Sequence, residues 1–328
     1  MILVVGGAGY IGSHTVKELV DQGHEVVVLD NLSTGHKESV DRRVIFEQGD
    51  LSNQVDLDRV FTKYSIDAVM HFAAFSLVGE SVKSPLKYYK NNVAATLLLL
   101  EMMMKYKVMN FIFSSTAATY GIPDTDLIVE ETKTNPINPY GRSKLMIEQM
   151  VKDFHDAYGL HYVILRYFNA AGAHVSGEIG EDHNPETHLI PLVLQHLLGK
   201  RESISIFGTD YPTPDGTCIR DYIHITDLAE AHILAVKSLL DGSKDGETYN
   251  LGNGTGFSVK EIIETCERVT ERKANVVLAD RRAGDPAQLI ASSGKIHEEL
   301  GWEAKFSLEA IIKTAWNWHS GHPDGYHE

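Results

Sequence analysis

The chain has 328 residues, and 30 lysines and arginines against 45 aspartates and glutamates give it a formal net charge of −15. Hydrophobic residues make up 43% of the chain and charged residues 23%, as in ordinary soluble globular proteins. This acidic balance argues against non-specific binding to nucleic acid or to an anionic membrane, because both need a basic surface.

The first half of the chain alternates short apolar segments with amphipathic ones. Six segments rich in Val, Ile and Phe are expected to form buried parallel strands, at 2–5, 25–29, 44–47, 68–72, 110–114 and 162–165. Helices are expected between them at 10–22, 55–64, 86–106 and 141–158, where Gly23 and Gly159 act as stop signals. This alternation predicts an α/β fold with a doubly wound parallel sheet.

The pattern changes after about residue 170. Gly, Pro and His become frequent through 173–191 and 207–216, and helices are expected again at 226–240 and 260–270. We therefore predict a first domain over 1–170, to which some later segments return. A smaller, mixed C-terminal lobe is expected over 171–328, built from insertions beyond the sheet and suited to binding a substrate.

The cellular location is inferred from cysteine use and from apolar segments. Cys218 and Cys266 are far apart and have no CxxC spacing, so they suggest no disulfide framework and suit a reducing compartment. The first strand begins at Ile2, which leaves no room for a signal peptide, and the apolar stretch 93–100 is too short to cross a bilayer. We expect a soluble cytoplasmic protein.

A glycine-rich turn directly follows the first strand. Gly6, Gly9 and Gly12 form a GxxGxxG pattern that opens a helix, which suits the pyrophosphate of a dinucleotide. Asp30 ends the second strand, 18 residues after Gly12, where a carboxylate binds ribose hydroxyls and repels a 2′-phosphate. The pattern favours NAD over NADP. Asp50, after the third strand, fits an adenine contact and an ordinary loop residue equally well.

The spacing of Tyr140 and Lys144 suggests a catalytic pair. Positions four apart share one face of a helix, and an ammonium beside a phenol lowers the phenol pKa from about 10. A positive nicotinamide ring would act in the same direction, which would make Tyr140 a general base. A surface Tyr/Lys pair is the alternative. The hydroxyl cluster that begins at Ser114 favours catalysis, because the carboxyl ends of parallel strands face the ligand crevice.

Together these motifs resemble the extended short-chain dehydrogenases/reductases, and more closely their sugar-nucleotide 4-epimerases, over essentially the whole chain. Further blocks carry the resemblance, namely HFAA (71–74), VGES (78–81), YYKNN (88–92), RYFN (166–169), DGTCIRDYIH (215–224) and RAGD (282–285). The resemblance implies a Rossmann domain that binds NAD over 1–170 and a lobe that mainly binds the UDP-sugar over 171–328. It also implies that the enzyme, an isomerase of galactose metabolism, interconverts UDP-galactose and UDP-glucose.

The same resemblance assigns roles to individual residues. Tyr140 would be the catalytic base, Lys144 its electrostatic partner, and Thr116 the hydroxyl that binds the sugar 4-oxygen. NAD would contact Gly6, Gly9, Tyr10, Ile11, Gly12, Asp30, Asn31, Asp50, Leu51, Phe72, Ala73, Ala74, Asn91, Ser114, Tyr140, Lys144 and Tyr167. The substrate would contact Thr116, Tyr140, Asn169, His188, Leu189, Phe207, Arg220, Arg282 and Asp285. The arginines suit a diphosphate, which they bind bidentately.

Three positions depart from the family pattern. Ser76 stands where many members have a lysine near the NAD ribose, and His188 stands where a substrate-binding Asn is frequent. Leu289 stands at the position that gates sugar size in the family, which leaves the acceptance of UDP-GlcNAc and UDP-GalNAc open.

Other reactions on this scaffold begin with the same oxidation at C4. The 4,6-dehydratases place Asp-Glu directly after the strand-end Thr, whereas Ala117 and Ala118 follow Thr116 here, so dehydration is disfavoured. An epimerase needs only room for the keto sugar to turn, and NAD can then stay bound. A catalytically silent NAD sensor is the alternative from a different class, but such a sensor would need none of Thr116, Tyr140 and Lys144.

Two further features each allow an ordinary structural interpretation beside a functional one. His183, Glu186 and His188 are spaced like metal ligands, but Pro185 breaks a helical ligand face and hydride transfer needs no metal, so we expect none. The apolar helices at 86–106 and 144–158 would either be buried within one chain or, as the resemblance implies, form the four-helix bundle of a homodimer.

Overall fold

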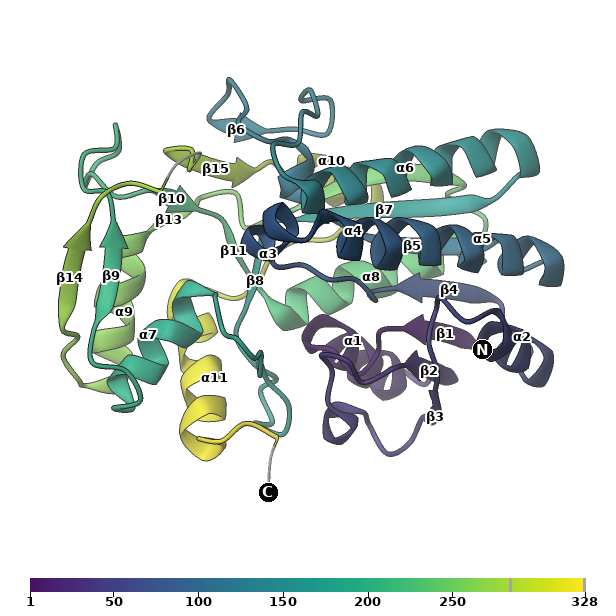
Figure 1. Cartoon of the computed structure of the whole chain (residues 1–328), viewed down its shortest axis with the longest axis horizontal. Coiled ribbons are helices and arrows are strands. Elements are labelled where there is room, and N and C mark those ends of the chain that lie inside the picture. The colour runs from purple at the N-terminus through teal and green to yellow at the C-terminus, as the bar shows by residue number, and fades with distance from the viewer. Residues whose placement is uncertain (283–284, 327–328) are drawn as a thin grey trace.

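A seven-stranded sheet, parallel throughout, forms the larger part of the computed structural model, which describes residues 1–282 and 285–326 (Figure 1). Its strand order is β12-β7-β5-β4-β1-β2-β3. The strands are β1 (Ile2–Val5), β2 (Val26–Asp30), β3 (Ile45–Gln48), β4 (Ala68–His71), β5 (Asn110–Thr116), β7 (His161–Tyr167) and β12 (Gly246–Leu251). The predicted α/β class and doubly wound sheet are confirmed, and β12 is a strand that the sequence did not reveal.

Helices cover both faces of this sheet. Along β1, Ile2 and Val4 belong to one buried cluster and Leu3 and Val5 to the other, as expected for side chains that alternate across a strand. The first face is covered by α1 (Tyr10–Asp21), α8 (Ile225–Leu240) and α10 (Gly294–Leu300), and the second by α2 (Gln54–Lys63), α5 (Ala95–Tyr106) and α6 (Pro139–Tyr158). Burial on both faces explains why the inner strands β1, β2, β4, β5 and β7 carry continuous apolar runs.

The order of the strands reverses beside β1, which places a crevice at one edge of the sheet. β1 pairs with β2 on one side and with β4 on the other. The chain therefore runs from β1 to β2 toward one end of the strand order and from β4 to β5 toward the other. The carboxyl ends of β1, β4 and β5 meet at this switch point. Ligands of doubly wound folds bind in the crevice that such a reversal opens.

The helix expected at 86–106 is interrupted. The segments α3 (Val78–Lys83) and α4 (Pro85–Tyr88) lead into a π-helical turn at Tyr89–Ala94, which continues as α5. Within that turn, the Asn92 side chain accepts a hydrogen bond from the Phe75 N–H and donates one to the Phe75 carbonyl, both at 3.0 Å. It also donates to Ser143 Oγ at 3.1 Å. These bonds hold the wider turn against α6, a tertiary effect that periodicity does not reveal.

The C-terminal lobe has its own core and a mixed sheet, as predicted. Its sheet has the order β13-β10-β15-β6, with one antiparallel pair, and β14 pairs with β9. The strands are β6 (Leu127–Ile128), β9 (Ile204–Phe207), β10 (Ile219–Arg220), β13 (Phe257–Ser258), β14 (Val276–Ala279) and β15 (Gln288–Ala291). The helices α7 (Leu189–Leu197), α9 (Val259–Thr270) and α11 (Leu308–Gly321) enclose the third apolar cluster. Figure 1 shows this lobe at the left.

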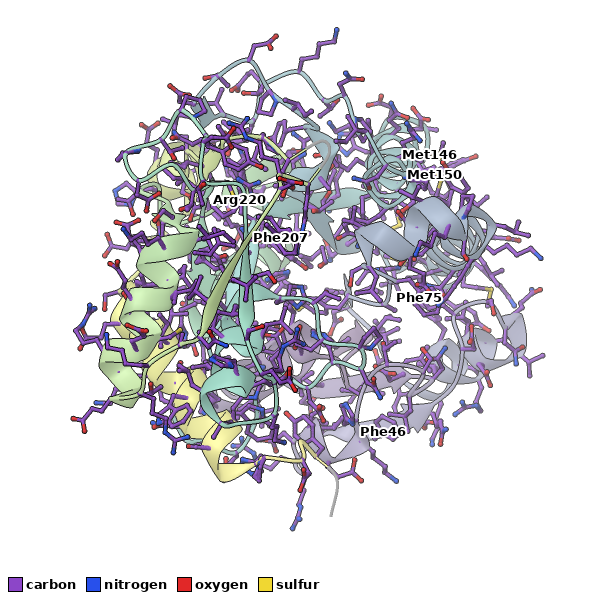
Figure 2. The ribbon with its side chains drawn as sticks, turned by 60° about the vertical axis from the view of Figure 1, so that its left-hand side comes forward. Phe46, Phe75, Met146, Met150, Phe207 and Arg220 are labelled. Atoms are coloured by element: carbon purple, nitrogen blue, oxygen red, sulfur yellow. The ribbon has the colours of Figure 1, made fainter. Side chains whose placement is uncertain are left out.

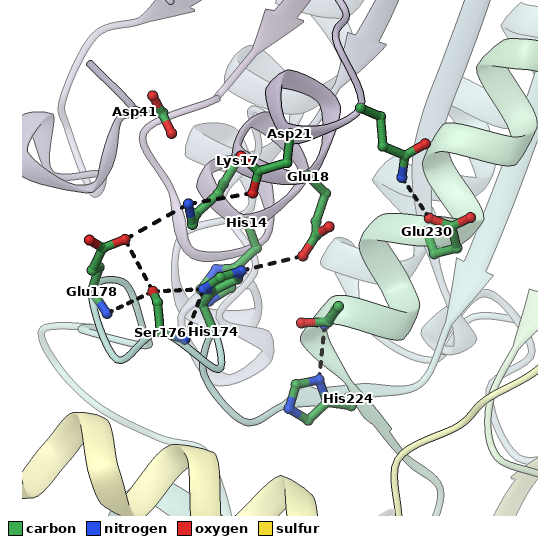
Figure 3. Close-up of polar contacts among 12 residues, drawn as sticks. His14, Lys17, Glu18, Asp21, Asp41, His174, Ser176, Glu178, His224 and Glu230 are labelled. Carbon is green, nitrogen blue, oxygen red and sulfur yellow. Dashed lines mark hydrogen bonds and ion pairs between the residues drawn. The ribbon is translucent and has the colours of Figure 1, made fainter. Parts of the chain in front are cut away.

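Two links join the lobe to the larger sheet. The short parallel pair β8 (Asn169–Ala171) and β11 (Tyr222–His224) lies between them (Figure 1). The segment after β8 is also held against α1, because His174 Nε2 lies 3.4 Å from Glu18 and Lys17 lies 3.8 Å from Glu178 (Figure 3). Across the described ranges 1–282 and 285–326, no helix combines the length and apolar character needed to cross a membrane.

Candidate functional site

The glycine turn after β1 is shaped for close approach to a ligand. A Cβ at Gly6 would lie 2.5 Å from the Ala73 nitrogen, and one at Gly12 would lie 2.2 Å from the Gly6 carbonyl oxygen, so neither position tolerates a side chain. At Gly9 the nearest atom would be the Gly6 oxygen at 3.6 Å, so the outer side is open. The helix α1 begins next, at Tyr10, without a side-chain cap. Its backbone N–H groups and positive dipole end therefore suit a phosphate.

Three polar residues adjoin this turn at the ends of β2 and β3. Asp30 accepts hydrogen bonds from the N–H groups of Ala8 at 2.9 Å and Leu32 at 2.8 Å, one on each carboxylate oxygen. Burial raises the pKa of Asp30, although these bonds act in the opposite direction. Asn31, which follows Asp30, donates a hydrogen bond to Asp50 at 2.8 Å and so brings Asp50 close to Asp30. Carboxylate oxygens can each accept a further hydrogen bond, so Asp30 suits ribose hydroxyls.

The segment after β4 lies opposite the glycine turn. The N–H groups of Phe72 and Ala73 both donate to the Val5 carbonyl, at 2.8 and 3.1 Å, so these residues lie across from Gly6. The Phe72 ring packs against His232, with the ring centroids 4.8 Å apart. Other residues expected to contact NAD stand nearby in the chain or on neighbouring strands: Tyr10 and Ile11 open α1, Leu51 and Ala74 follow Asp50 and Ala73, and Asn91 lies in the π-helical turn.

Thr116, Tyr140 and Lys144 meet at the carboxyl end of β5. A side-chain hydrogen bond joins Tyr140 to Thr116, which is the last residue of β5. The Lys144 ammonium donates to the Ser114 carbonyl at 2.7 Å, and the Ser114 hydroxyl is hydrogen-bonded to the hydroxyl of Tyr167 on β7. Asn138 caps the start of α6. Tyr140 and Lys144 lie one turn apart in the first half of this helix, so their side chains share the face that is directed at the sheet edge.

The electrostatics of this group differ in one respect from the sequence expectation. Burial raises the pKa of Tyr140, and the hydrogen bond with Thr116 offsets that rise only in part. Burial also lowers the pKa of Lys144 to about 7, although the charge of Glu148 acts against this. The lysine, whose ammonium is directed to the Ser114 carbonyl, therefore does not by itself make Tyr140 a base. A positively charged nicotinamide ring, when bound, supplies the further positive charge.

Sequence reasoning missed the ion pair that supports Lys144. Glu148, one turn further along α6, accepts hydrogen bonds from Arg166 Nε at 2.9 Å and Nη2 at 2.5 Å, and from the Ser115 hydroxyl at 2.5 Å. The side chains of Glu148 and Arg166 are 1% and 5% exposed. Although burial acts against its charge, the bonds to Glu148 raise the pKa of Arg166. The i,i+4 spacing of Lys144 and Glu148 was the available signal.

The residues expected to hold the UDP part gather on the C-terminal lobe. Arg220 Nη2 lies 3.7 Å from Asp285 Oδ1, and the Arg282 guanidinium lies 4.0 Å from the centroid of the Phe207 ring. Arg220, Arg282 and Asp285 all act electrostatically on Cys218, which places the three charges in one neighbourhood. Figure 2 shows Phe207 and Arg220 on the same side of the molecule. Of the RAGD block, 283–284 lie outside the described residues.

The remaining substrate positions flank this group. Asn169 begins β8 and donates to the Asp221 carbonyl at 2.8 Å, while Leu189 opens α7 directly after His188. His188 Nδ1 lies 2.7 Å from Glu181 and 3.0 Å from Glu186, so this imidazole is held by two carboxylates. Of the other two departures, Leu289 pairs in register with Arg220 and Ser76 is exposed.

Two arginines beside an aromatic ring suit a diphosphate joined to a flat base, and the glycine turn with Asp30 suits NAD. Thr116, Tyr140 and Lys144 add a hydroxyl, a phenol and an ammonium, the groups that an oxidation at a sugar carbon needs. The model of the NAD dependent epimerase/dehydratase family matches residues 2–252. The chain therefore belongs to this family.

Individual relatives are similar over their whole length. The UDP-glucose 4-epimerase of Halalkalibacterium halodurans is 58% identical over 99% of this chain and 97% of its own. The crystal structure of the Brucella ovis UDP-glucose 4-epimerase in complex with NAD is 51% identical, with a TM-score of 0.94 over 96% of this chain and 97% of that one. The Bifidobacterium longum enzyme in complex with NAD+ and UDP is 40% identical, with a TM-score of 0.94 over 99% of both chains.

Proposed function

We propose that this protein catalyses the NAD-dependent interconversion of UDP-galactose and UDP-glucose, as an isomerase that acts at C4 of the sugar. The observation that carries the proposal is the meeting of Thr116, Tyr140 and Lys144 at the end of β5. Relatives called UDP-glucose 4-epimerase, similar over the whole chain, support it. So do related structures that hold NAD, UDP or UDP-glucose.

In this proposal each residue has one task. Tyr140 takes the proton of the 4-hydroxyl, and Thr116, which is already hydrogen-bonded to Tyr140, orients that oxygen. Lys144 stabilises the phenolate by its charge. NAD, which the glycine turn and Asp30 would hold, would supply the hydride acceptor for C4 and then the hydride donor to the opposite face of the 4-keto sugar. Tyr140 then gives the proton back, so the reaction is redox-neutral.

NAD and the UDP-sugar are chemically different ligands, which supports their binding to different parts of the chain. We assign NAD to the crevice lined by the glycine turn, Asp30 and the ends of β4 and β5. The UDP part is assigned to the group around Arg220, Arg282 and Phe207, and the sugar to the space beside Tyr140. Dehydration at C6 is disfavoured, because Ala117 and Ala118 follow Thr116 where that reaction needs acidic side chains.

We further propose a cytoplasmic homodimer. The helices α3 to α6 expose apolar side chains that include Val82 at 62%, Leu86 at 65%, Leu97 at 46% and Met146 at 42%. Figure 2 shows Met146 and Met150 together on α6, away from Phe207. Such a surface suits a two-fold contact between copies. The two buried cysteines are unpaired, as suits a reducing compartment. Sedimentation at micromolar concentration tests the dimer, and a monomeric mass would refute it.

Catalysis is tested by comparing two tyrosine variants on the same helix. Purified protein incubated with UDP-galactose, without added cofactor, should form UDP-glucose through the NAD it retains. Tyr140→Phe should lose about 10²-fold or more of this turnover, since a general base contributes 10²–10⁴-fold, while its NAD content stays unchanged. Tyr158→Phe, altered at a side chain that is 62% exposed, is the matched control and should keep full activity. Equal, measurable turnover by Tyr140→Phe and wild type would refute the assignment of Tyr140 as the base, whereas no turnover by wild type would favour an NAD sensor.

A further inference from the structure

Four potential metal ligands converge in the loop that precedes α7. Glu181, His183, Glu186 and His188 each place one ligand atom so that the four atoms lie within 4.8 Å of one another. From Glu181 Oε1, Nδ1 of His183 lies at 3.0 Å and Nδ1 of His188 at 2.7 Å. From Glu186, these two nitrogens lie at 3.8 and 3.0 Å. Ligands bound tetrahedrally to zinc at 2.0–2.2 Å stand about 3.4 Å apart, which is within this span.

The loop achieves what a helix could not. Pro185 was expected to break a helical ligand face, and residues 181–188 indeed form no helix, since α7 begins only at Leu189. The chain instead bends at 184–185, so that both imidazoles turn the same nitrogen, Nδ1, toward Glu181. Pro185 therefore argues only against a metal site on a helix, and it does not argue against a metal site in this loop.

The burial of the two carboxylates calls for a compensating charge. The side chains of Glu181 and Glu186 are only 3% and 4% exposed. The rings of His183 and His188 both lie against these carboxylates, with their centroids 5.3 Å apart. One divalent cation shared by the four ligands would supply the compensating charge at a single point between them.

We propose that Glu181, His183, Glu186 and His188 bind one divalent transition-metal ion of the zinc type. Two imidazole nitrogens and two carboxylate oxygens suit zinc, which accepts both donor types in a tetrahedral site. Because the protein supplies all four ligands, the site has no open position and its role is structural rather than catalytic. The proposal reverses the expectation from sequence that the chain holds no metal.

The surroundings indicate what such an ion stabilises. The His183 ring packs edge-on against Tyr10, the first residue of α1, with the centroids 6.0 Å apart. The Trp318 indole on α11 donates to the Glu181 carbonyl at 3.1 Å. His188 precedes Leu189, which opens the substrate-side helix α7. The ion therefore fixes the loop between the cofactor-side turn and the substrate-side helix. This consequence for the active site rests on the proposed function, whereas the metal content does not.

The test is the elemental analysis of full-length protein purified without a polyhistidine tag and without chelator. Wild type and His24→Gln, which alters a histidine outside the cluster, should each contain about one zinc ion per chain. His183→Gln and Glu186→Gln should retain less than about a tenth of that amount. A chelator such as dipicolinate should lower the melting temperature of wild type and of His24→Gln, and should leave that of His183→Gln unchanged.

Two results would overturn the proposal. One is wild-type protein that is free of metal and takes up none when dialysed against zinc buffered at nanomolar free concentration. The other is zinc that remains in His183→Gln and Glu186→Gln at the wild-type level, which would place it elsewhere. Both results are read from metal content, so they do not depend on UDP-galactose turnover. Zinc found in a protein without epimerase activity would refute the proposed function and leave the site standing.

Discussion

Replacing Glu148 by Gln tests the buried ion pair that adjoins the proposed catalytic group. The amide keeps the shape of the side chain and one acceptor oxygen, but it removes the negative charge opposite Arg166, whose side chain is 5% exposed. Removing one partner of a buried pair costs about 3–5 kcal/mol, because the other charge stays buried without compensation. We expect about 3 kcal/mol for Glu148→Gln, since the remaining oxygen still accepts from Arg166 or Ser115.

The corresponding change in melting temperature follows from the size of the chain. Unfolding entropy is about 2.1 cal/mol/K per residue, or roughly 0.7 kcal/mol/K for 328 residues, so about 3 kcal/mol lowers the melting temperature by about 4 °C. Scanning calorimetry in one buffer measures the shift. Glu264→Gln is the matched control, because the ion pair of Glu264 with Lys260 is 3.9 Å long and the Glu264 side chain is 58% exposed. Its shift should stay below about 1 °C.

The same variant should change the pH dependence of turnover. The charge of Glu148 acts against the burial that lowers the pKa of Lys144 to about 7, so its loss lowers that pKa further. In the proposed reaction, Lys144 must be protonated to stabilise the phenolate of Tyr140. The alkaline limb of UDP-galactose turnover should therefore move to lower pH in Glu148→Gln. A melting temperature and an alkaline limb equal to those of Glu264→Gln would refute both roles of Glu148.

Two further predictions concern the cofactor turn and the buried lysine. Gly12→Ala places a Cβ 2.2 Å from the Gly6 oxygen, so the variant should release nearly all its NAD, as measured by chromatography of the nucleotide after denaturation; wild-type NAD content would contradict this. Lys144 has a folded pKa of about 7 against 10.5 unfolded, so the unfolded chain binds more protons between these values and stability should rise from pH 7 to 10.5. Below pH 7 the cost of burying the charge is fully present. The free energy of unfolding of Lys144→Met should therefore lack the rise between pH 7 and 10.5. A pH dependence of Lys144→Met equal to that of wild type would contradict the burial of a charged lysine.

The inner strands β1, β2, β4, β5 and β7 were predictable because both of their faces are buried, which leaves continuous apolar runs in the sequence. The first five runs lie within one or two residues of β1 to β5, and the sixth lies inside β7. The edge strand β12 was missed, because its sequence Gly246–Leu251 is half polar and its pairing with β7 spans a long stretch of chain. Local patterns report such an edge strand poorly.

The candidate site was predictable where chemistry follows chain spacing, as for Gly6 to Gly12 or Tyr140 and Lys144. Burial was not predictable in this way, and burial decides the direction of the Tyr140 pKa. Loop geometry was also hidden. The loop before α7 takes its shape from distant contacts such as that between Trp318 and Glu181, so no local pattern shows that its four side chains converge.

The central claim is that the hydrogen at C4 is removed and returned within one closed site. The most direct measurement uses UDP-galactose that carries deuterium at C4, incubated with the purified protein in ordinary water and analysed by mass spectrometry. We predict UDP-glucose that retains the deuterium at C4, because a hydride held by the bound cofactor does not exchange with solvent. UDP-glucose in which solvent hydrogen has replaced the deuterium, or no conversion at all, would contradict the claim.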